Sequence, residues 1–208
     1  MWMRNCSSPT NAGSSFNPWD RMSGAIMQIS PTTIPDVLIL EPTVCTDERG
    51  YLMETFQERT FRQAGLPSSF VQENHSHSHR GVLRGLHYQI RHAQGKLVRV
   101  VQGEIFDVVV DLRRRSPRYG NWTAVRLSAE NRQQLWVPPG CAHGYLVESE
   151  SADVTYKVTD FYAPEWERTL SWNDPQLAIA WPLAEGVVPQ LSAKDACGAS
   201  FAEADKYP

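Results

Sequence analysis

Short apolar segments with strand character follow one another from Lys96 onward, and they restrict the fold of this chain more than any other feature. Turn-forming steps separate the segments, among them Gly103, Ser116-Pro117 and Pro138-Pro139-Gly140. The predicted strands are residues 97–101, 104–112, 122–127, 134–137, 144–148 and 154–162. Many short strands with little helix predict an all-β sandwich or barrel. One short helix is expected at residues 57–64, before Gly65.

The length of the chain sets the number of domains. Its 208 residues, 41% of them hydrophobic, suffice for one sizeable core and leave little for a second. Residues 1–24 are rich in turn-forming residues and nearly free of periodic apolar positions, so we expect a disordered N-terminal extension before a single domain of residues 25–208. A start codon placed too early and genuine extra sequence explain this extension equally well.

Charge and cysteine usage exclude several classes of partner. The net charge of -3, without a long basic run, argues against binding to a nucleic-acid backbone. The four cysteines lie far apart and form no Cys-x-x-Cys pair, so they predict neither a disulfide framework nor a zinc site. There is no apolar stretch of the roughly 18 residues that a membrane span needs, and no apolar block of a signal peptide. We therefore expect a cytoplasmic protein without nucleic-acid or membrane partners.

A tight turn delivers a histidine to the start of a predicted strand. It reads Pro138-Pro139-Gly140-Cys141-Ala142-His143. By itself, such a histidine is usually a polar residue at a sheet edge. The Pro-x-Gly-x-x-His pattern, however, resembles the second half-motif of the cupin superfamily, whose jelly rolls place this histidine inside the barrel. The resemblance implies an all-β cupin jelly-roll barrel or sandwich with few short helices.

The first cupin half-motif normally supplies His-x-His and a downstream glutamate for a metal ion. The matching stretch here is Arg84-Gly85-Leu86-His87-Tyr88-Gln89, which keeps one histidine. Gln89 takes the place of the second histidine, and Lys96 follows it. A site built from His87 and His143 would have too few ligands beside a repelling ammonium group. We therefore expect a barrel without a metal ion or other cofactor.

Several longer motifs occur in a fixed order between Met27 and Asp195. They are Phe70-Val71-Gln72-Glu73-Asn74, Gly81-Val82-Leu83-Arg84-Gly85-Leu86-His87-Tyr88-Gln89, Gln94-Gly95-Lys96-Leu97-Val98-Arg99, Tyr156-Lys157 and Leu191-Ser192-Ala193-Lys194-Asp195. Together they resemble the run of motifs in dTDP-4-dehydrorhamnose 3,5-epimerases. The resemblance implies a cofactor-independent homodimer that acts on a dTDP-4-keto-6-deoxyhexose in dTDP-L-rhamnose biosynthesis.

This chemistry removes protons from the carbons that flank a C4 ketone. It needs a base, a group that stabilises the enolate oxygen, and an acid on the opposite face of the sugar. The resemblance makes His87 the base, oriented by Asp195. It makes Lys96 the enolate stabiliser and Tyr156 the acid. Read without the resemblance, Asp195 is a solvated surface charge and Tyr156 a packing residue of a strand.

The resemblance also implies a set of substrate-binding side chains. Arg84 carries a planar fork suited to diphosphate or sugar oxygens, three positions before His87. Arg49 and Glu54 match the family segment that contacts the nucleotide. The remaining matches are Gln72, Asn74, His143, Glu167 and Lys194.

The run His75-x-His77-x-His79 competes with this interpretation, because alternate residues of a strand face one way and three imidazoles could bind zinc. In that case Gln72, Asn74, Ser76 and Ser78 face the other way, toward the pocket that the resemblance implies. We therefore do not expect a functional metal site here.

Three other functions remain open at this stage. A relative that inverts only C3 or only C5 keeps much the same residues. A metal-dependent cupin dioxygenase or isomerase is disfavoured by the incomplete histidine set. A sugar-nucleotide-binding cupin without catalytic activity would bind the same ligand and exchange no hydrogen with solvent.

Overall fold

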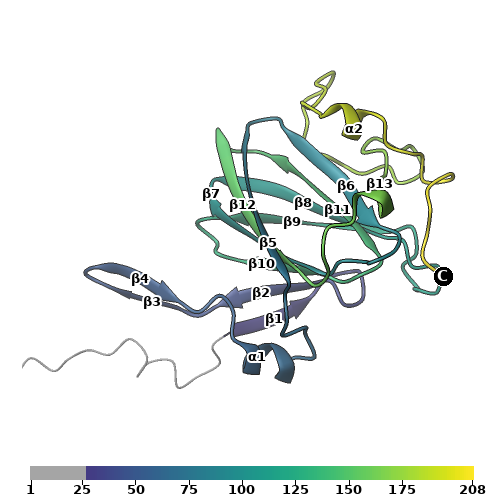
Figure 1. The fold of residues 1–208 in the computed structure, drawn as a ribbon. Helices are drawn as coiled ribbons and strands as arrows, with labels where there is room; N and C mark the ends of the chain where they lie inside the picture. The colour runs from purple at the N-terminus through teal and green to yellow at the C-terminus, as the bar shows by residue number, and fades with distance from the viewer. Residues whose placement is uncertain (1–26) are drawn as a thin grey trace, which may run out of the picture.

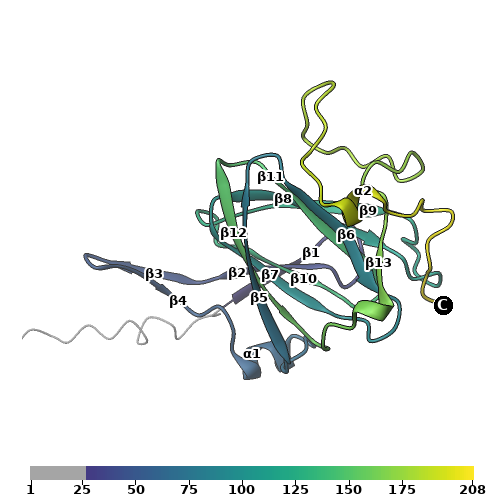
Figure 2. The same ribbon diagram turned by 45° about the horizontal axis from the view of Figure 1, so that its top comes forward.

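The computed structural model describes residues 27–208, so the predicted N-terminal extension lies outside the described residues. Two antiparallel sheets face each other and form a flattened barrel (Figures 1 and 2). The six-stranded sheet has the order β1 (Met27–Pro31), β2 (Leu38–Pro42), β10 (Gln134–Val137), β7 (Lys96–Gln102), β12 (Ser151–Val158), β5 (Gln72–His79). The five-stranded sheet has the order β13 (Glu167–Thr169), β6 (Leu83–Gln89), β11 (Cys141–Val147), β8 (Glu104–Asp111), β9 (Trp122–Ser128). The all-β jelly-roll prediction is confirmed.

Side chains alternate in direction along each strand, and those that point inward fill the space between the sheets. On β7, Val98 and Val100 point inward, and on β8, Ile105 and Val109 meet them in one buried cluster. The intervening residues face outward, as the period of two in a strand requires. Each buried valine or isoleucine contributes about 1.5–3 kcal/mol relative to an exposed one. The barrel therefore rests on a continuous apolar interior.

The outer faces of both sheets are also partly covered. The helix α1 (Glu58–Gln63) packs Phe61 against Leu97 and Trp136 on the outside of the six-stranded sheet. The C-terminal segment packs Phe201 and Ala204 on the outside of the five-stranded sheet (Figure 1). No helix among residues 27–208 has the length and apolar character that crossing a membrane requires.

A separate two-stranded ribbon, β3 (Val44–Asp47) and β4 (Gly50–Met53), projects away from the barrel in both views (Figures 1 and 2). Tyr51 and Leu52 on this ribbon are exposed large apolar side chains. An isolated two-stranded hairpin is at best marginally stable in water. The ribbon therefore presents an apolar surface that this chain covers only in part, through the Arg132 guanidinium 4.3 Å from the centre of the Tyr51 ring.

The predicted strands differ from the observed ones at two functionally relevant ends. The strand β11 begins at Cys141, so His143 is its third residue and not the residue at its start. The strand β12 ends at Val158, and residues 159–163 leave the sheet as a loop, whereas the apolar pattern predicted a strand as far as residue 162.

The helix prediction at residues 57–64 corresponds to α1. A second short helix, α2 (Ala193–Ala196), was not predicted; its N-cap Ser192 accepts a hydrogen bond from the Asp195 N–H.

Two glycines allow β6 and β11 to approach closely. A Cβ atom on Gly144 would lie 2.6 Å from the Arg84 carbonyl oxygen, and one on Gly85 would lie 2.6 Å from Gly144 Cα. The register of the strand pair shifts between His143 and Tyr145 at this point. Glycine is needed here because backbone atoms, which cannot move aside, occupy the space of a side chain.

We predict that Gly144→Ala destabilises the fold by at least about 2–3 kcal/mol, because the added methyl group overlaps backbone. Gly81→Ala is the control, since its φ is +78° but a Cβ atom would meet nothing within 4 Å. It should cost only the left-handed strain of about 1–2 kcal/mol. Urea unfolding of both variants tests this difference, and equal losses would contradict the close-approach argument.

Candidate active site

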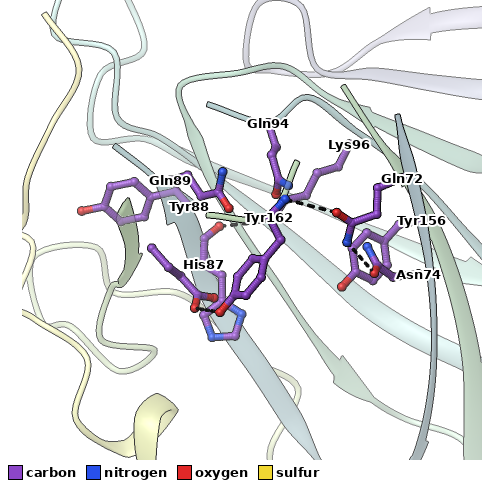
Figure 3. A pocket seen from close by; sticks show the side chains of 10 residues that line it. Gln72, Asn74, His87, Tyr88, Gln89, Gln94, Lys96, Tyr156 and Tyr162 are labelled. Atoms are coloured by element: carbon purple, nitrogen blue, oxygen red, sulfur yellow. Dashed lines mark hydrogen bonds between the residues drawn. The ribbon is translucent and has the colours of Figure 1, made fainter. Parts of the chain in front are cut away.

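A cavity opens between the two sheets at the end of the barrel where inward-facing residues become polar. One part is lined by Gln72, Asn74, His87, Tyr88, Gln89, Gln94, Lys96, Tyr156, Tyr162 and Glu167 (Figure 3). An adjoining part shares His87, Lys96, Tyr156, Tyr162 and Glu167, and adds Ser76, Arg84, His143, Gly144 and Tyr145. The structure thus brings most of the sequence-predicted site residues to one place.

His87 on β6 is bonded to a carboxylate from a distant part of the chain. Its Nε2 lies 2.5 Å from Asp195 Oδ1, and Asp195 is only 3% exposed, on α2. Burial raises the pKa of Asp195, but hydrogen bonds from His87 and Ser192 outweigh burial and leave that pKa below its ordinary value. An ionised carboxylate only accepts hydrogen bonds, so we assign the proton of neutral His87 to Nε2. Nδ1 is then the basic nitrogen.

The protonation state of His87 suits a general base. Burial lowers its pKa below the ordinary value, although the Asp195 carboxylate opposes this shift. The imidazole is therefore neutral at physiological pH and can accept a proton. The Asp195 carboxylate stabilises the imidazolium that would form, as in other histidine–carboxylate pairs.

Lys96 on β7 lies at the floor of the same cavity. Its side chain is buried, and Nζ lies 3.4 Å from the His87 carbonyl oxygen. Burial lowers its pKa to about 8, against the opposing effect of Glu167 and Asp107. At neutral pH this residue is still an ammonium group, in a place where water is largely excluded.

Tyr156 reaches the cavity from β12, in the sheet opposite to that of His87. In Figure 3, the Tyr156 ring lies apart from the His87 ring, on the side of Gln72 and Asn74. Burial raises the pKa of Tyr156, so its hydroxyl keeps its proton and can donate it. A flat ligand between the two sheets would therefore meet a base on one face and an acid on the other.

Charged and polar side chains surround the mouth of the cavity. Glu167 on β13 forms an ion pair with Lys194, with Oε1 2.5 Å from Nζ, and accepts a hydrogen bond of 2.7 Å from the Tyr162 hydroxyl. Asn74 accepts a hydrogen bond of 2.9 Å from Gln72. Arg84 Nε donates to Ser78 Oγ at 2.9 Å, which orients its guanidinium at the cavity.

Gln89 fixes the loop that carries Tyr162. Its side-chain amide donates to the carbonyl oxygens of His92 and Phe161, at 2.7 and 3.2 Å, and its Oε1 accepts from the Ala163 N–H at 2.9 Å. Tyr162 lines both parts of the cavity, yet it was absent from the predicted site. The apolar pattern placed it at the end of a strand, where nothing marks it as a site residue.

His143 contributes to the cavity with a partner that sequence reasoning also missed. Its Nε2 lies 2.9 Å from both carboxylate oxygens of Asp107 on β8. Asp107 and Asp111 both interrupt the apolar run of residues 105–112, and such an interruption is the signal that could have revealed Asp107. A carboxylate is almost never fully buried unless it is paired, so each of them calls for a partner inside the fold.

Three predicted binding residues do not line the cavity of their own chain: Lys194, which reaches it only through its ion pair with Glu167, and Arg49 and Glu54. Arg49 lies in the turn of the β3–β4 ribbon, where it is exposed and pairs with Asp47. Glu54 follows β4, and its Oε2 accepts a hydrogen bond of 3.1 Å from Gln57. Within residues 27–208, Glu54 Oε1 is buried without a hydrogen-bond partner.

The three alternating histidines face away from the cavity. His75 and His77 are exposed on β5 and contact the two carboxylate oxygens of Asp153 at 2.9 and 3.1 Å. Gln72, Asn74 and Ser76 line the cavity on the other face, as the strand period predicts. Among residues 27–208, no group of three histidine, cysteine, aspartate or glutamate side chains is placed to hold a metal ion.

Fold and site together define a jelly-roll protein of the cupin type, with a histidine–aspartate pair facing a tyrosine across its barrel. Residues 31–203 match the family model described as dTDP-4-dehydrorhamnose 3,5-epimerase. The chain therefore belongs to the dTDP-4-dehydrorhamnose 3,5-epimerase family, a family of isomerases.

Individual relatives support this assignment. The dTDP-4-dehydrorhamnose 3,5-epimerase of Pseudomonas aeruginosa is 57% identical over 183 residues, which are 88% of this chain and 100% of the relative. The solved structure of the dTDP-6-deoxy-D-glucose-3,5-epimerase of Legionella pneumophila, in complex with dTDP-4-keto-L-rhamnose, is 50% identical with a TM-score of 0.82. The match covers 86% of this chain and 95% of that one.

A relative of different specificity shares the fold. ChmJ, a 3'-monoepimerase from Streptomyces bikiniensis solved with dTDP-quinovose, is 36% identical with a TM-score of 0.77, over 83% of this chain and 87% of that one. The barrel alone therefore does not decide how many carbons are inverted.

We predict a bell-shaped pH dependence of kcat/KM for exchange of substrate hydrogen with solvent. The rate should fall as the pH drops through the lowered pKa of His87, because the base becomes protonated. It should fall again as the pH rises through about 8, because Lys96 loses its ammonium charge. A rate that keeps rising well above that pH would contradict the role of Lys96.

Proposed function

We propose that this protein is a dTDP-4-dehydrorhamnose 3,5-epimerase, which converts dTDP-4-dehydro-6-deoxy-D-glucose to dTDP-4-dehydro-L-rhamnose. One observation carries the proposal: the His87–Asp195 pair and Tyr156 face one cavity from opposite sheets, beside the buried ammonium group of Lys96. Inversion at carbon needs a proton acceptor and a proton donor on opposite faces, and this arrangement supplies both.

The reaction begins when His87 Nδ1 removes the proton from a carbon beside the C4 ketone. The electron pair of that C–H bond forms a C=C bond, and the carbonyl electrons move to the C4 oxygen. The Lys96 ammonium group stabilises this enolate, a contribution of about 3–4 kcal/mol for a well-placed donor in a water-poor site. Tyr156 then protonates the carbon from the opposite face, and the ketone is restored.

The same groups act again at the second carbon. After one inversion His87 holds the removed proton and Tyr156 has lost its own, so both must exchange with solvent before the next cycle. Tyr162, which lines the cavity, is 51% exposed, so the cavity meets solvent on that side. Both inverted positions therefore acquire hydrogen from the solvent.

Some of the substrate-binding groups contribute a positive charge, and others contribute hydrogen bonds. Arg84 and Lys194 offer cationic groups for the diphosphate, and Arg84 presents the geometry that bidentate contact with phosphate oxygens requires. Gln72, Asn74 and His143 offer hydrogen-bond partners for the sugar hydroxyls. Glu167 holds Lys194 at the cavity mouth.

We further propose that the protein acts as a homodimer in which the β3–β4 ribbon supplies Arg49 and Glu54 to the cavity of the partner subunit. The ribbon leaves the barrel and exposes Tyr51 and Leu52, and Arg49 lies outside the cavity of its own chain. A neighbouring subunit would supply apolar contacts for the exposed faces of Tyr51 and Leu52.

Incubation with dTDP-4-dehydro-6-deoxy-D-glucose in heavy water tests the proposed function. We expect deuterium at both C3 and C5, detected by NMR of the product, from protein freed of metal by chelation. Deuterium at one carbon would indicate a monoepimerase. Binding without deuterium uptake would indicate a sugar-nucleotide-binding protein, and activity that needs an added metal would indicate a metal-dependent cupin.

We predict that Tyr156→Phe lowers inversion by at least about a hundredfold, because it removes the proton donor and keeps the ring. Hydrogen exchange catalysed by His87 should persist, since deuterium can return from the face it left. Tyr119→Phe is the control, because Tyr119 packs against Phe201 outside the cavity. Wild-type inversion by a folded Tyr156→Phe protein would assign this tyrosine to packing.

The dimer proposal predicts complementation between two inactive variants. His87→Ala and Arg49→Ala should each be nearly inactive as pure dimers. A mixed dimer restores one complete site if the ribbon acts on the partner, so a random mixture should recover up to about a quarter of wild-type activity. If the ribbon serves its own chain, mixing will recover nothing.

A further inference from the structure

A short segment, residues 191–198, carries Asp195 to the cavity. Its helix α2 lies beside β6 in both views (Figures 1 and 2). Backbone hydrogen bonds hold the chain at the two flanks of the segment: Gln190 bonds to the chain that enters β6, and Ala199 bonds to the end of β13. Among the residues that the structure describes, the backbone hydrogen bonds of residues 191–198 stay within the segment. The direction of the Asp195 side chain therefore depends on its side-chain partners.

Ser192 is bonded to Asp195 twice. Its hydroxyl oxygen accepts from the Asp195 backbone N–H at 3.1 Å, and its hydroxyl proton is donated to Asp195 Oδ2 at 2.8 Å. The other carboxylate oxygen, Oδ1, lies 2.5 Å from His87 Nε2. Each oxygen thus has its own donor, and a rotation of the carboxylate would break at least one of these bonds.

Ser192 also lies between the carboxylate and solvent. Asp195 is only 3% exposed, whereas Ser192 is an exposed residue. Loss of the Ser192 hydroxyl would open Oδ2 to water, and water would then compete with His87 for the carboxylate. The serine therefore fixes both the direction and the hydration of the group that pairs with the base.

The direction of this carboxylate decides which nitrogen of His87 is basic. A neutral imidazole carries its proton on Nε2 or on Nδ1, and the partner of one nitrogen selects the tautomer. The Asp195 carboxylate accepts from Nε2 and so leaves Nδ1 free to take a proton. If the carboxylate turned away, both tautomers would be populated, and only part of the molecules would keep a basic Nδ1.

Provided that the proposed function holds for this site, we infer that Ser192 is a positioning residue, which holds the Asp195 carboxylate on His87 Nε2 and so keeps the imidazole in the tautomer that removes the substrate proton. Ser192 is not among the side chains that line the cavity, so it acts through Asp195. A purely structural role as the N-cap of α2 would stabilise the fold and leave the tautomer unchanged. The two roles therefore differ in a measurable quantity.

NMR of 15N-labelled histidine side chains tests this inference without any need for activity. The chain contains six histidines, and His87→Gln identifies the His87 signals. Above the lowered pKa of His87, the wild type should show the nitrogen shifts of a single Nε2–H tautomer. In Ser192→Ala we expect the shifts of Nδ1 and Nε2 to move toward each other, because both tautomers become populated. Ser192→Thr, which keeps the hydroxyl group, should retain the wild-type shifts.

Ser200→Ala is the matched control. The Ser200 hydroxyl accepts from the Glu203 N–H at 3.3 Å and donates to Glu203 Oε2 at 2.8 Å, which repeats the bonds of Ser192 around an exposed carboxylate. Its replacement should lower stability and leave the His87 shifts unchanged. The other charged groups near His87 are the same in every variant, and they are Lys96, Lys194 and Glu167.

Kinetics give the second readout. In Ser192→Ala, kcat and kcat/KM for hydrogen exchange should fall together by about tenfold, because the tautomer of the base matters in the transition state and not in substrate binding. In an Asp195→Ala background the same substitution should change kcat by less than about twofold, since no carboxylate is left to position.

An unchanged His87 tautomer in folded Ser192→Ala would overturn the inference, and so would equal losses of kcat with and without the Asp195 carboxylate. If Ser192→Ala does not fold, Ser192→Gly takes its place, because N-cap positions tolerate glycine. Absence of deuterium uptake by the wild type would instead contradict the proposed function, while the nitrogen shifts would still decide whether Ser192 positions the histidine–aspartate pair.

Discussion

The close approach of β6 and β11 at Gly85 and Gly144 is the constraint on which the site depends. Because neither strand carries a side chain there, His87 and His143 lie directly opposite each other in the strand pair. Each histidine then meets its own carboxylate, His87 from α2 and His143 from β8. A wider separation of these strands would break the spatial relation of both pairs at once. Two residues without side chains therefore decide where the chemistry takes place.

One part of the barrel interior is filled by apolar side chains, and the other part carries ionisable groups. Burial in this interior explains the pKa shifts of those groups. Inward positions on one strand can be apolar at one end and ionisable at the other, as Val98, Val100 and Lys96 show on β7. Burial then changes the acid–base properties of the polar end: it lowers the pKa of His87 and Lys96 and raises that of Tyr156. The shifts of His87 and Tyr156 favour the protonation states that an epimerase needs at neutral pH, whereas the shift of Lys96 to about 8 works against its ammonium form. The same burial that stabilises the fold thus prepares the base and the acid, and it sets an upper pH limit for the ammonium group.

The sequence predicted the barrel and most of the residues that line the cavity, and the physical reasons differ between the two. Alternation and turn residues predicted strands such as 134–137 because each strand is a local pattern. The family motifs linked His87 to Asp195 across 108 residues, a contact that no local pattern contains. Tyr162 was missed because its position depends on hydrogen bonds from distant residues: Gln89 bonds to the backbone on both sides of it, and Gln72 accepts from the Tyr162 N–H. The placement of Arg49 outside its own cavity depends on the path of a whole ribbon, which residue spacing does not encode.

Gln89 also limits the substitutions that the cavity mouth can accept. It stands where metal-binding cupins carry a second histidine, and here its amide holds the backbone of residues 92, 161 and 163 around the cavity mouth. Gln89→His would leave those backbone groups without their partner and release the loop of Tyr162, while the ammonium of Lys96 would still repel a cation. The position therefore acts as a structural brace, and no single substitution there would produce a metal-binding site.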